Sequence, residues 1–256
     1  LEEKTVLLSI VIPTLNESKS GLLLPILQAY QDVQHCEIIC VDGGSQDDTC
    51  EIVRQSTARL VQTDISSRAG RLNEGIKQAR YGLILLHHPR SLLEVKGIEA
   101  LIQQAEKIKW GAFTHRFDLQ HPLLRFTSWY SNYIRGDRRG IYYLDHCLFA
   151  KKQLLLDVGL LPEVDIFEDT ELCLRLKKKN KGRRLAYLSE TSAIRFQTFG
   201  IYRQAFYNQM LKCLYYLKRS DKSMNKSYEQ QLQLNSQYLD DKTFRKTEDE
   251  SRKKLD

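Results

Sequence analysis

The sequence predicts an α/β domain with a mostly parallel central sheet flanked by helices. Over the first 110 residues, short apolar segments rich in β-branched residues alternate with segments of helical periodicity, which is typical of βαβ units. The chain has 256 residues, 42% hydrophobic and 28% charged, as in an ordinary globular domain. We expect one domain over residues 1–217, with halves at about 1–110 and 111–217, and a polar helical or disordered tail at 218–256.

The elements of the first half follow in regular order. Residues 6–12 are apolar and β-branched and are followed by Pro13, which predicts a strand buried on both faces. The next expected elements are a helix at 21–30, a strand at 36–41, a helix at 49–55, a strand at 59–62, a helix through Asn73 and Ala79, and a strand at 83–86. Ligands of such folds bind at the carboxyl ends of the parallel strands.

Beyond Trp110 the pattern is less regular. We expect this half to build the second side of a cleft. Its expected elements are strands at 114–117 and 142–149, helices at 154–158 and 168–179, and a segment of helical spacing at 204–217.

The net charge of +7 favours an anionic partner, such as a phosphorylated ligand, nucleic acid or an acidic membrane surface. No apolar run approaches the roughly 18 residues that span a bilayer, so we expect a cytoplasmic protein, with the inner membrane face as the alternative location. The aromatic and basic segment 199–216 suits peripheral membrane contact, although core packing is the commoner role. The six cysteines lack CxxC spacing and are expected to be reduced, packed thiols.

Polar residues follow three of the expected strands, at 14–17, 42–45 and 87–90. Asp42 can accept the imino proton of a base while Gly43 lets the backbone approach closely; a simple turn is the alternative. Arg68, Arg71 and Arg90 can bind a diphosphate, because guanidinium groups match phosphate oxygens. A solvated surface is the alternative for these arginines.

Four segments together resemble the ordered motifs of family 2 glycosyltransferases. They are Leu-Ser-Ile-Val-Ile-Pro-Thr-Leu-Asn-Glu at 8–17, Val-Asp-Gly-Gly-Ser at 41–45, Gly-Arg-Leu-Asn-Glu-Gly at 70–75 and Phe-Glu-Asp-Thr-Glu-Leu-Cys-Leu-Arg-Leu at 167–176. The resemblance spans about residues 6–200. It implies a single Rossmann-like domain of the A-type glycosyltransferase fold, whose first half binds a nucleotide and whose second half binds an acceptor.

The resemblance also implies an activity, the inverting transfer of a sugar from a nucleotide-diphosphate sugar to an unknown hydroxyl acceptor. Asp169 matches the catalytic base, which takes the proton of the attacking hydroxyl; the alternative for 168–171 is an acidic helix start favoured by the helix dipole. We expect Asp42 and Asp169 to face a common pocket. The expected contacts with the nucleotide sugar are Pro13, Thr14, Glu17, Asp42, Gly43, Arg71 and Arg90, and those on the acceptor side are Asp145, His146 and Glu168.

The sequence departs from the family at the strand ending at Leu86, where an Asp-x-Asp-like metal motif is expected and His87-His88-Pro89-Arg90 stands instead. Arg90 could supply the positive charge in place of a metal. Alternatively His87 or His88, with an acid such as Asp145, could hold Mn²⁺, or less readily Mg²⁺; His88 is the candidate ligand. A third explanation is lost catalysis, leaving a nucleotide-sugar-binding or scaffold protein.

Two other classes of function fit less well. The basic run 175–184 lacks the interleaved aromatic residues that stack on bases, so we expect no nucleic-acid partner. A nicotinamide-dependent dehydrogenase would carry Gly-x-Gly-x-x-Gly at its first helix, and this sequence does not.

Overall fold

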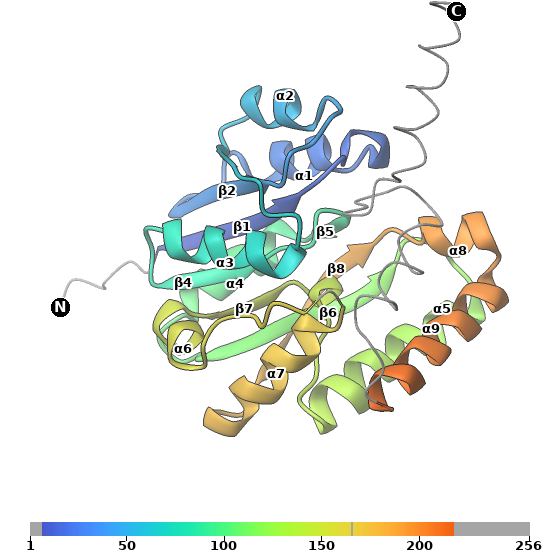
Figure 1. The fold of residues 1–256 in the computed structure, drawn as a ribbon. Coiled ribbons are helices and arrows are strands. Elements are labelled where there is room, and N and C mark those ends of the chain that lie inside the picture. Colours follow the sequence, from blue (N-terminus) through green and yellow to red (C-terminus); the bar gives the residue numbers. More distant parts are fainter. Residues whose placement is uncertain (1–6, 165, 218–256) are drawn as a thin grey trace, which may run out of the picture.

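The computed structural model describes residues 7–164 and 166–217, and the tail predicted at 218–256 lies outside them. Within the described residues, eight strands form one mixed sheet in the order β3-β2-β1-β4-β7-β6-β8-β5 (Figure 1). The strands are β1 (Leu8–Thr14), β2 (Cys36–Asp42), β3 (Arg59–Gln62), β4 (Leu83–Leu86), β5 (Ser91–Leu93), β6 (Trp110–Phe117), β7 (Leu148–Lys151) and β8 (Arg183–Thr191).

The sheet is parallel in its first half and mixed in its second. β1 pairs in parallel with β2 and β4, and β2 pairs in parallel with β3. β7 runs antiparallel between β4 and β6, β8 is parallel to β6, and β5 is antiparallel to β8. The carboxyl ends of β1, β2, β4, β6 and β8 therefore meet at one edge of the sheet, where ligands of α/β folds bind.

Helices cover both faces of the sheet (Figure 1). They are α1 (Leu23–Tyr30), α2 (Thr49–Arg54), α3 (Arg68–Gln78), α4 (Val95–Gln103), α5 (Pro122–Trp129), a π-helix (Tyr130–Arg138), α6 (Lys152–Asp157), α7 (Glu168–Lys179), α8 (Ile194–Phe199) and α9 (Ile201–Tyr216), with short 3-10 helices at Ser18–Ser20 and Leu144–His146.

Alternation along the strands divides the core into two clusters, one on each face of the sheet. In β1, Ile10 and Ile12 pack with residues of α1 and α4, whereas Val11 packs with residues of α3. A Cβ on Gly75 of α3 would lie 2.3 Å from Val11 Cγ1, so glycine allows α3 to approach β1 closely. A third, smaller cluster, around Leu124 and Phe196, packs α5, α8 and α9 together.

The structure corrects several predicted elements. Residues 142–149 do not form one strand, because a 3-10 helix and a left-handed Cys147 (φ 50°) precede β7. Pro13 lies inside β1 and is paired with Val41; it is tolerated because the pairing with β4 ends at Val11. The predictions omitted β5, α4, α5, the π-helix, β8 and α8.

The six cysteines are all free thiols and four of them are buried, as predicted. Within residues 7–164 and 166–217, no helix combines the length and apolarity required to cross a lipid bilayer. Segment 199–216 corresponds almost entirely to α9, whose buried side chains are Gln204 and Leu211.

Candidate active site

A pocket of about 230 Å³ lies at the carboxyl edge of the sheet, between the loops after β1 and β4 and the elements of the second half. The predicted residues that line it are Pro13, Arg71, His88, Arg90, Asp145, His146 and Asp169. Thr14, Glu17, Asp42, Gly43 and Glu168 were also predicted and do not line it. Six cationic side chains and two carboxylates line the pocket, so its lining is positively charged.

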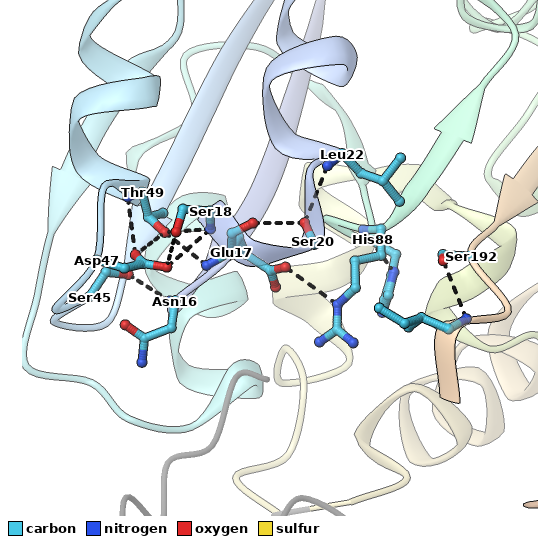
Figure 2. Close-up of polar contacts among 12 residues, drawn as sticks. Asn16, Glu17, Ser18, Ser20, Leu22, Ser45, Asp47, Thr49, His88 and Ser192 are labelled. Carbon is cyan, nitrogen blue, oxygen red and sulfur yellow. Dashed lines mark hydrogen bonds and ion pairs between the residues drawn. The ribbon is translucent and has the colours of Figure 1, made fainter. Parts of the chain in front are cut away.

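The loops after β1 and β2 are held together by polar side chains (Figure 2). Asp47 Oδ2 accepts hydrogen bonds from the backbone and hydroxyl of Ser18, and Asp47 Oδ1 accepts from those of Thr49. Burial alone would raise the pKa of Asp47, but these hydrogen bonds together outweigh that effect and lower it. The backbone N–H of Glu17 donates to Thr49 Oγ1 at 2.8 Å. The first two predicted loops therefore form one rigid wall beside the pocket.

Asp42 belongs to this wall and does not face the pocket. Its side chain is fully buried. Oδ1 accepts from the backbone N–H groups of Gly44 and Ser45 at 3.0 and 2.8 Å, and Oδ2 accepts from the hydroxyls of Thr14 and Ser45. The expected arrangement, with Asp42 and Asp169 facing a common pocket, is not the one found.

Gly43 links this wall to the pocket through Arg71. A Cβ on Gly43 would lie 2.6 Å from Arg71 Nη1 and 2.7 Å from the carbonyl oxygen of Ile65. Arg71 is buried and its Nη1 donates to the carbonyl of Ser66 at 2.6 Å. The absence of a side chain at Gly43 therefore allows the Arg71 guanidinium to lie against the loop.

Glu17 and Arg90 form a buried ion pair at the pocket rim. Glu17 Oε2 lies 3.3 Å from Arg90 Nε, with the two side chains 0% and 9% exposed. Figure 2 shows the Glu17 carboxylate pointing toward this contact. The backbone N–H of Arg90 donates to Nδ1 of His88 at 3.2 Å. Removing one partner of a buried pair leaves a charge that water no longer solvates, so the pair fixes the position of Arg90.

The two histidines of the β4–β5 loop point to different places. His87 is fully buried, with Nε2 hydrogen-bonded to the Tyr30 hydroxyl at 2.8 Å, and burial lowers its pKa to about 3. The suggestion that His87 binds a metal is therefore wrong, because its ring belongs to the core. His88 Nε2 lies 3.8 Å from Asp145 Oδ1, which is the pairing that the sequence suggested.

A resident divalent cation does not fit the described donors. Among residues 7–164 and 166–217, no cluster of three or more His, Cys, Asp or Glu side chains is arranged to hold a metal. The His88–Asp145 pair supplies two donors, whereas Mg²⁺ and Mn²⁺ favour oxygen-rich sets. Burial lowers the pKa of His88 to about 3, and Asp145 has a lowered pKa because nearby positive groups outweigh its own burial.

Asp169 lies at the first turn of α7 and lines the pocket. Oδ2 accepts from the backbone N–H of Leu144 at 2.8 Å and Oδ1 from that of Thr170 at 2.6 Å. Burial, and next the charge of Glu168, raise the pKa of Asp169 to about 6. Such a carboxylate is ionised at neutral pH yet basic enough to accept a proton.

Glu168, the residue before Asp169, forms an ion pair with Arg68. The Glu168 side chain is 1% exposed, and its Oε1 lies 2.5 Å from Arg68 Nε. Arg68 lines the pocket from α3, so the pair connects the two halves of the chain. Glu168, which was expected on the acceptor side, therefore contacts Arg68 of the nucleotide-side half.

Among the pocket residues that sequence reasoning missed are His115, Arg135, Tyr143 and Lys212. They come from β6, the π-helix, the segment before β7, and α9. The Arg135 guanidinium carbon lies 3.3 Å from the ring centroid of Tyr143. The His115 ring lies beside that of His146, with centroids 5.2 Å apart. No motif marks these residues, since their proximity arises from folding alone.

The comparisons with known proteins concern family and fold. A model of the family described as "Glycosyl transferase family 2" matches residues 9–145, just over half of the 256 residues. No curated protein sequence matches the chain.

Several solved structures share the fold at low identity. S. aureus TarS 1–349 is 19% identical with a TM-score of 0.61, over 73% of this chain and 60% of TarS 1–349. The mannosyltransferase PcManGT from Pyrobaculum calidifontis, in complex with GDP-Man and Mn²⁺, is 19% identical with a TM-score of 0.55, over 72% of this chain and 56% of that one. Glucosyl-3-phosphoglycerate synthase from Mycobacterium tuberculosis, in complex with Mn²⁺, UDP and glucosyl-3-phosphoglycerate, is 14% identical with a TM-score of 0.55, over 73% and 70%.

Proposed function

Because the chain belongs to glycosyl transferase family 2, we propose that its pocket transfers a sugar from a nucleoside diphosphate sugar to a hydroxyl acceptor, with inversion at the anomeric carbon. The nucleoside diphosphates in structures of the same fold support this donor class: UDP-GlcNAc with TarS and GDP-Man with PcManGT. The observation that carries the proposal is the position of Asp169, a buried carboxylate with a pKa of about 6 in a pocket whose lining has six cations and two carboxylates.

The donor would lie along the wall formed by the loops after β1 and β2. Pro13, Arg71 and Arg90 line the pocket on this side, and their proposed role is to contact the donor. Thr14 and Asp42 are hydrogen-bonded to each other at 3.1 Å inside the wall. Their proposed role is to fix the loop that the nucleoside packs against, so they act through the backbone and not through their own side chains.

Positive charge for the diphosphate would come from the arginines. Arg68, Arg71 and Arg90 all line the pocket from the nucleotide-side half. Guanidinium groups bind phosphate oxygens in a bidentate manner, and fixed positive charge near a departing diphosphate stabilises the transition state. We propose that this set takes the part of the divalent cation that the family motif normally binds, so that transfer does not require a metal.

Asp169 would act as the general base. As the acceptor oxygen attacks the anomeric carbon, its hydroxyl proton passes to the Asp169 carboxylate, and the bond between the anomeric carbon and the diphosphate oxygen breaks. The electron pair of that bond leaves with the nucleoside diphosphate. One displacement of this kind inverts the anomeric configuration without a covalent intermediate on the protein.

Calorimetry and donor hydrolysis test the proposal. We expect UDP or GDP and one of their sugars to bind with comparable affinity in EDTA and in Mn²⁺, and Arg90→Gln to weaken that binding at least tenfold. Donor turnover should fall by about 10² to 10⁴ in Asp169→Asn. Glu99→Gln is the matched control, because Glu99 is exposed on α4 and does not line the pocket.

The main alternative is a catalytically silent homologue that binds a nucleotide sugar or serves as a scaffold. It is favoured by the absence of an acid in the segment 87–90 after β4. Donor binding without turnover for any acceptor would support it. If no nucleotide binds, both proposals fail. Turnover that requires Mn²⁺ would reject the metal-free part alone.

A further inference from the structure

Three of the six cations that line the pocket, Arg135, Arg195 and Lys212, are not used by the proposed transfer, and two of them lie beside the ring of Tyr143. Arg135 comes from the π-helix and Lys212 from α9, and both line the pocket. The guanidinium carbon of Arg135 lies 3.3 Å and the Lys212 ammonium nitrogen 6.0 Å from the ring centroid of Tyr143. Across the described ranges, neither forms an ion pair with a carboxylate. The positive charges of Arg135 and Lys212 repel each other beside the Tyr143 ring. A bound anion near both would therefore be attracted by both.

Unpartnered polar atoms surround the same place. Counting only partners among the described residues, His115 Nδ1 and Nε2, His146 Nδ1 and Arg135 Nε are all buried without a hydrogen bond. His115 is 4% exposed and lines the pocket. A buried polar atom without a partner destabilises a fold, and a bound ligand with several oxygens would form hydrogen bonds with these atoms together.

The two histidine rings are neutral at physiological pH. Burial lowers the pKa of His115 to about 4, and burial, followed by the charges of His115 and Arg135, lowers the pKa of His146 well below its usual range. A neutral imidazole has one N–H donor and one acceptor nitrogen. The pair can therefore donate to a phosphoryl oxygen and accept from a hydroxyl of the same ligand.

These four side chains lie in the second half of the chain, close to Asp169 and on the side proposed for the acceptor. Tyr143, over which Arg135 stacks, directly precedes Leu144, whose backbone N–H donates to Asp169 at 2.8 Å. The arginines assigned to the donor lie in the other half of the chain. Apolar side chains line the same part of the pocket, namely Phe117, Ile194, Phe196 and Leu211.

We propose that Arg135, Lys212, His115 and His146 form the acceptor subsite, and that the acceptor carries a phosphoryl group in addition to the hydroxyl that is glycosylated. The inference rests on the proposed transfer activity and specifies its acceptor class. Two cations match the charge of a phosphate monoester dianion, and the apolar side chains contact the carbon skeleton that links its two functional groups.

Titration of the full chain, saturated with UDP, tests the subsite with two soluble probes, inorganic phosphate and phenyl phosphate. We expect both to bind without displacing UDP, phenyl phosphate more tightly because of the apolar lining. Arg135→Met and Lys212→Met should each weaken binding at least tenfold. Arg138→Gln and Arg203→Gln, exposed positions on the same two helices, should not. Thermal unfolding of each variant shows whether it folds. If Arg135→Met does not fold, Lys212→Met alone tests the subsite.

A second experiment, binding to lipid vesicles, distinguishes a lipid headgroup from a free phosphate ester as the source of the phosphoryl group. Lys212-dependent binding to vesicles of phosphatidic acid, and not to phosphatidylcholine, would indicate a lipid headgroup; binding of the soluble probes alone would indicate a free phosphate ester. The proposal is overturned if probe binding is unchanged in both variants, or if the probes compete with UDP, which would place them on the donor arginines. If UDP itself does not bind, the proposed function fails, while titration of the nucleotide-free chain still tests the subsite.

Discussion

Replacing Asp169 with asparagine should stabilise the fold at neutral pH while it removes transfer activity. Asp169 is 6% exposed, and burial and the charge of Glu168 raise its pKa to about 6 against the opposing effect of Arg68. An unfolded aspartate titrates near 3.9. A difference of about two pH units corresponds to about 3 kcal/mol, at about 1.4 kcal/mol per unit.

The sign follows from where the proton binds. The folded carboxyl group binds its proton more tightly than the unfolded one, so the free energy of unfolding falls as the pH rises from about 4 to about 6. Asparagine does not ionise and avoids this loss. It has one oxygen, so it gives up one of the bonds accepted from Leu144 and Thr170, at a cost of about 1 kcal/mol. We expect a net gain of about 2 kcal/mol at pH 7 and no gain at pH 4.

Urea unfolding between pH 4 and pH 8 measures the stability change, and donor turnover measures the loss of activity. The variant should be more stable than the parent only above about pH 5, with turnover reduced by about 10² to 10⁴. Glu99→Gln should show neither effect. A variant less stable than the parent at pH 7, or a gain equal at every pH, would refute the electrostatic reasoning, and turnover within tenfold of the parent would refute the base assignment.

Three further changes test other parts of the site. Gly43→Ala places a Cβ 2.6 Å from Arg71 Nη1 and should destabilise the fold by about 1–3 kcal/mol and weaken UDP binding, both read by calorimetry; an unchanged UDP affinity would show that this contact is not needed. His87→Leu removes the hydrogen bond to Tyr30 and should lower stability by about 1 kcal/mol while leaving nucleotide affinity in Mn²⁺ and in EDTA as in the parent; a selective loss in Mn²⁺ would return His87 to the metal ligands. Burial, and next the charge of Arg135, lower the pKa of Lys212 to about 8, so phenyl phosphate affinity should decline as the pH rises through 8 and should lose that decline in Lys212→Met; a flat profile in the parent chain would contradict the assignment.

Much of the nucleotide-side half was readable because its signals are local. Apolar runs such as 8–12 must be buried on both faces, and the loops that follow parallel strands must share one edge. Strand order predicted that the loop with His88 and Arg90 lies at this edge, and the family resemblance gave Arg71 and Asp169; all four line the pocket. These predictions needed only periodicity, family motifs and strand direction.

The second half depends on contacts between distant residues. β8 begins with Arg183 and Arg184, which in the sequence belong to a basic run expected to be solvated. In the fold, Arg184 Nη2 lies 2.7 Å from Oδ2 of Asp137, 47 residues earlier, and the Arg184 guanidinium group lies over the ring of Tyr133. The prediction that Asp42 faces the pocket was wrong because of contacts close to it in the sequence. Its oxygens are satisfied by the loop that it was expected to present, and hydrogen-bond saturation is not encoded in residue type.

In the proposed metal-free transfer, Arg90 and Arg68 would hold their positive charge differently from a metal ion. A divalent cation brings two charges with oxygen ligands that the diphosphate can share, whereas Arg90 is bound to Glu17 at 3.3 Å and Arg68 to Glu168 at 2.5 Å. An arriving diphosphate would therefore compete with two buried carboxylates for these guanidinium groups. The carboxylates hold the arginines in place before the donor binds, which lowers the ordering cost of binding. They also reduce the charge that each arginine offers, so the proposed metal-free transfer would draw on Arg68, Arg71 and Arg90 together.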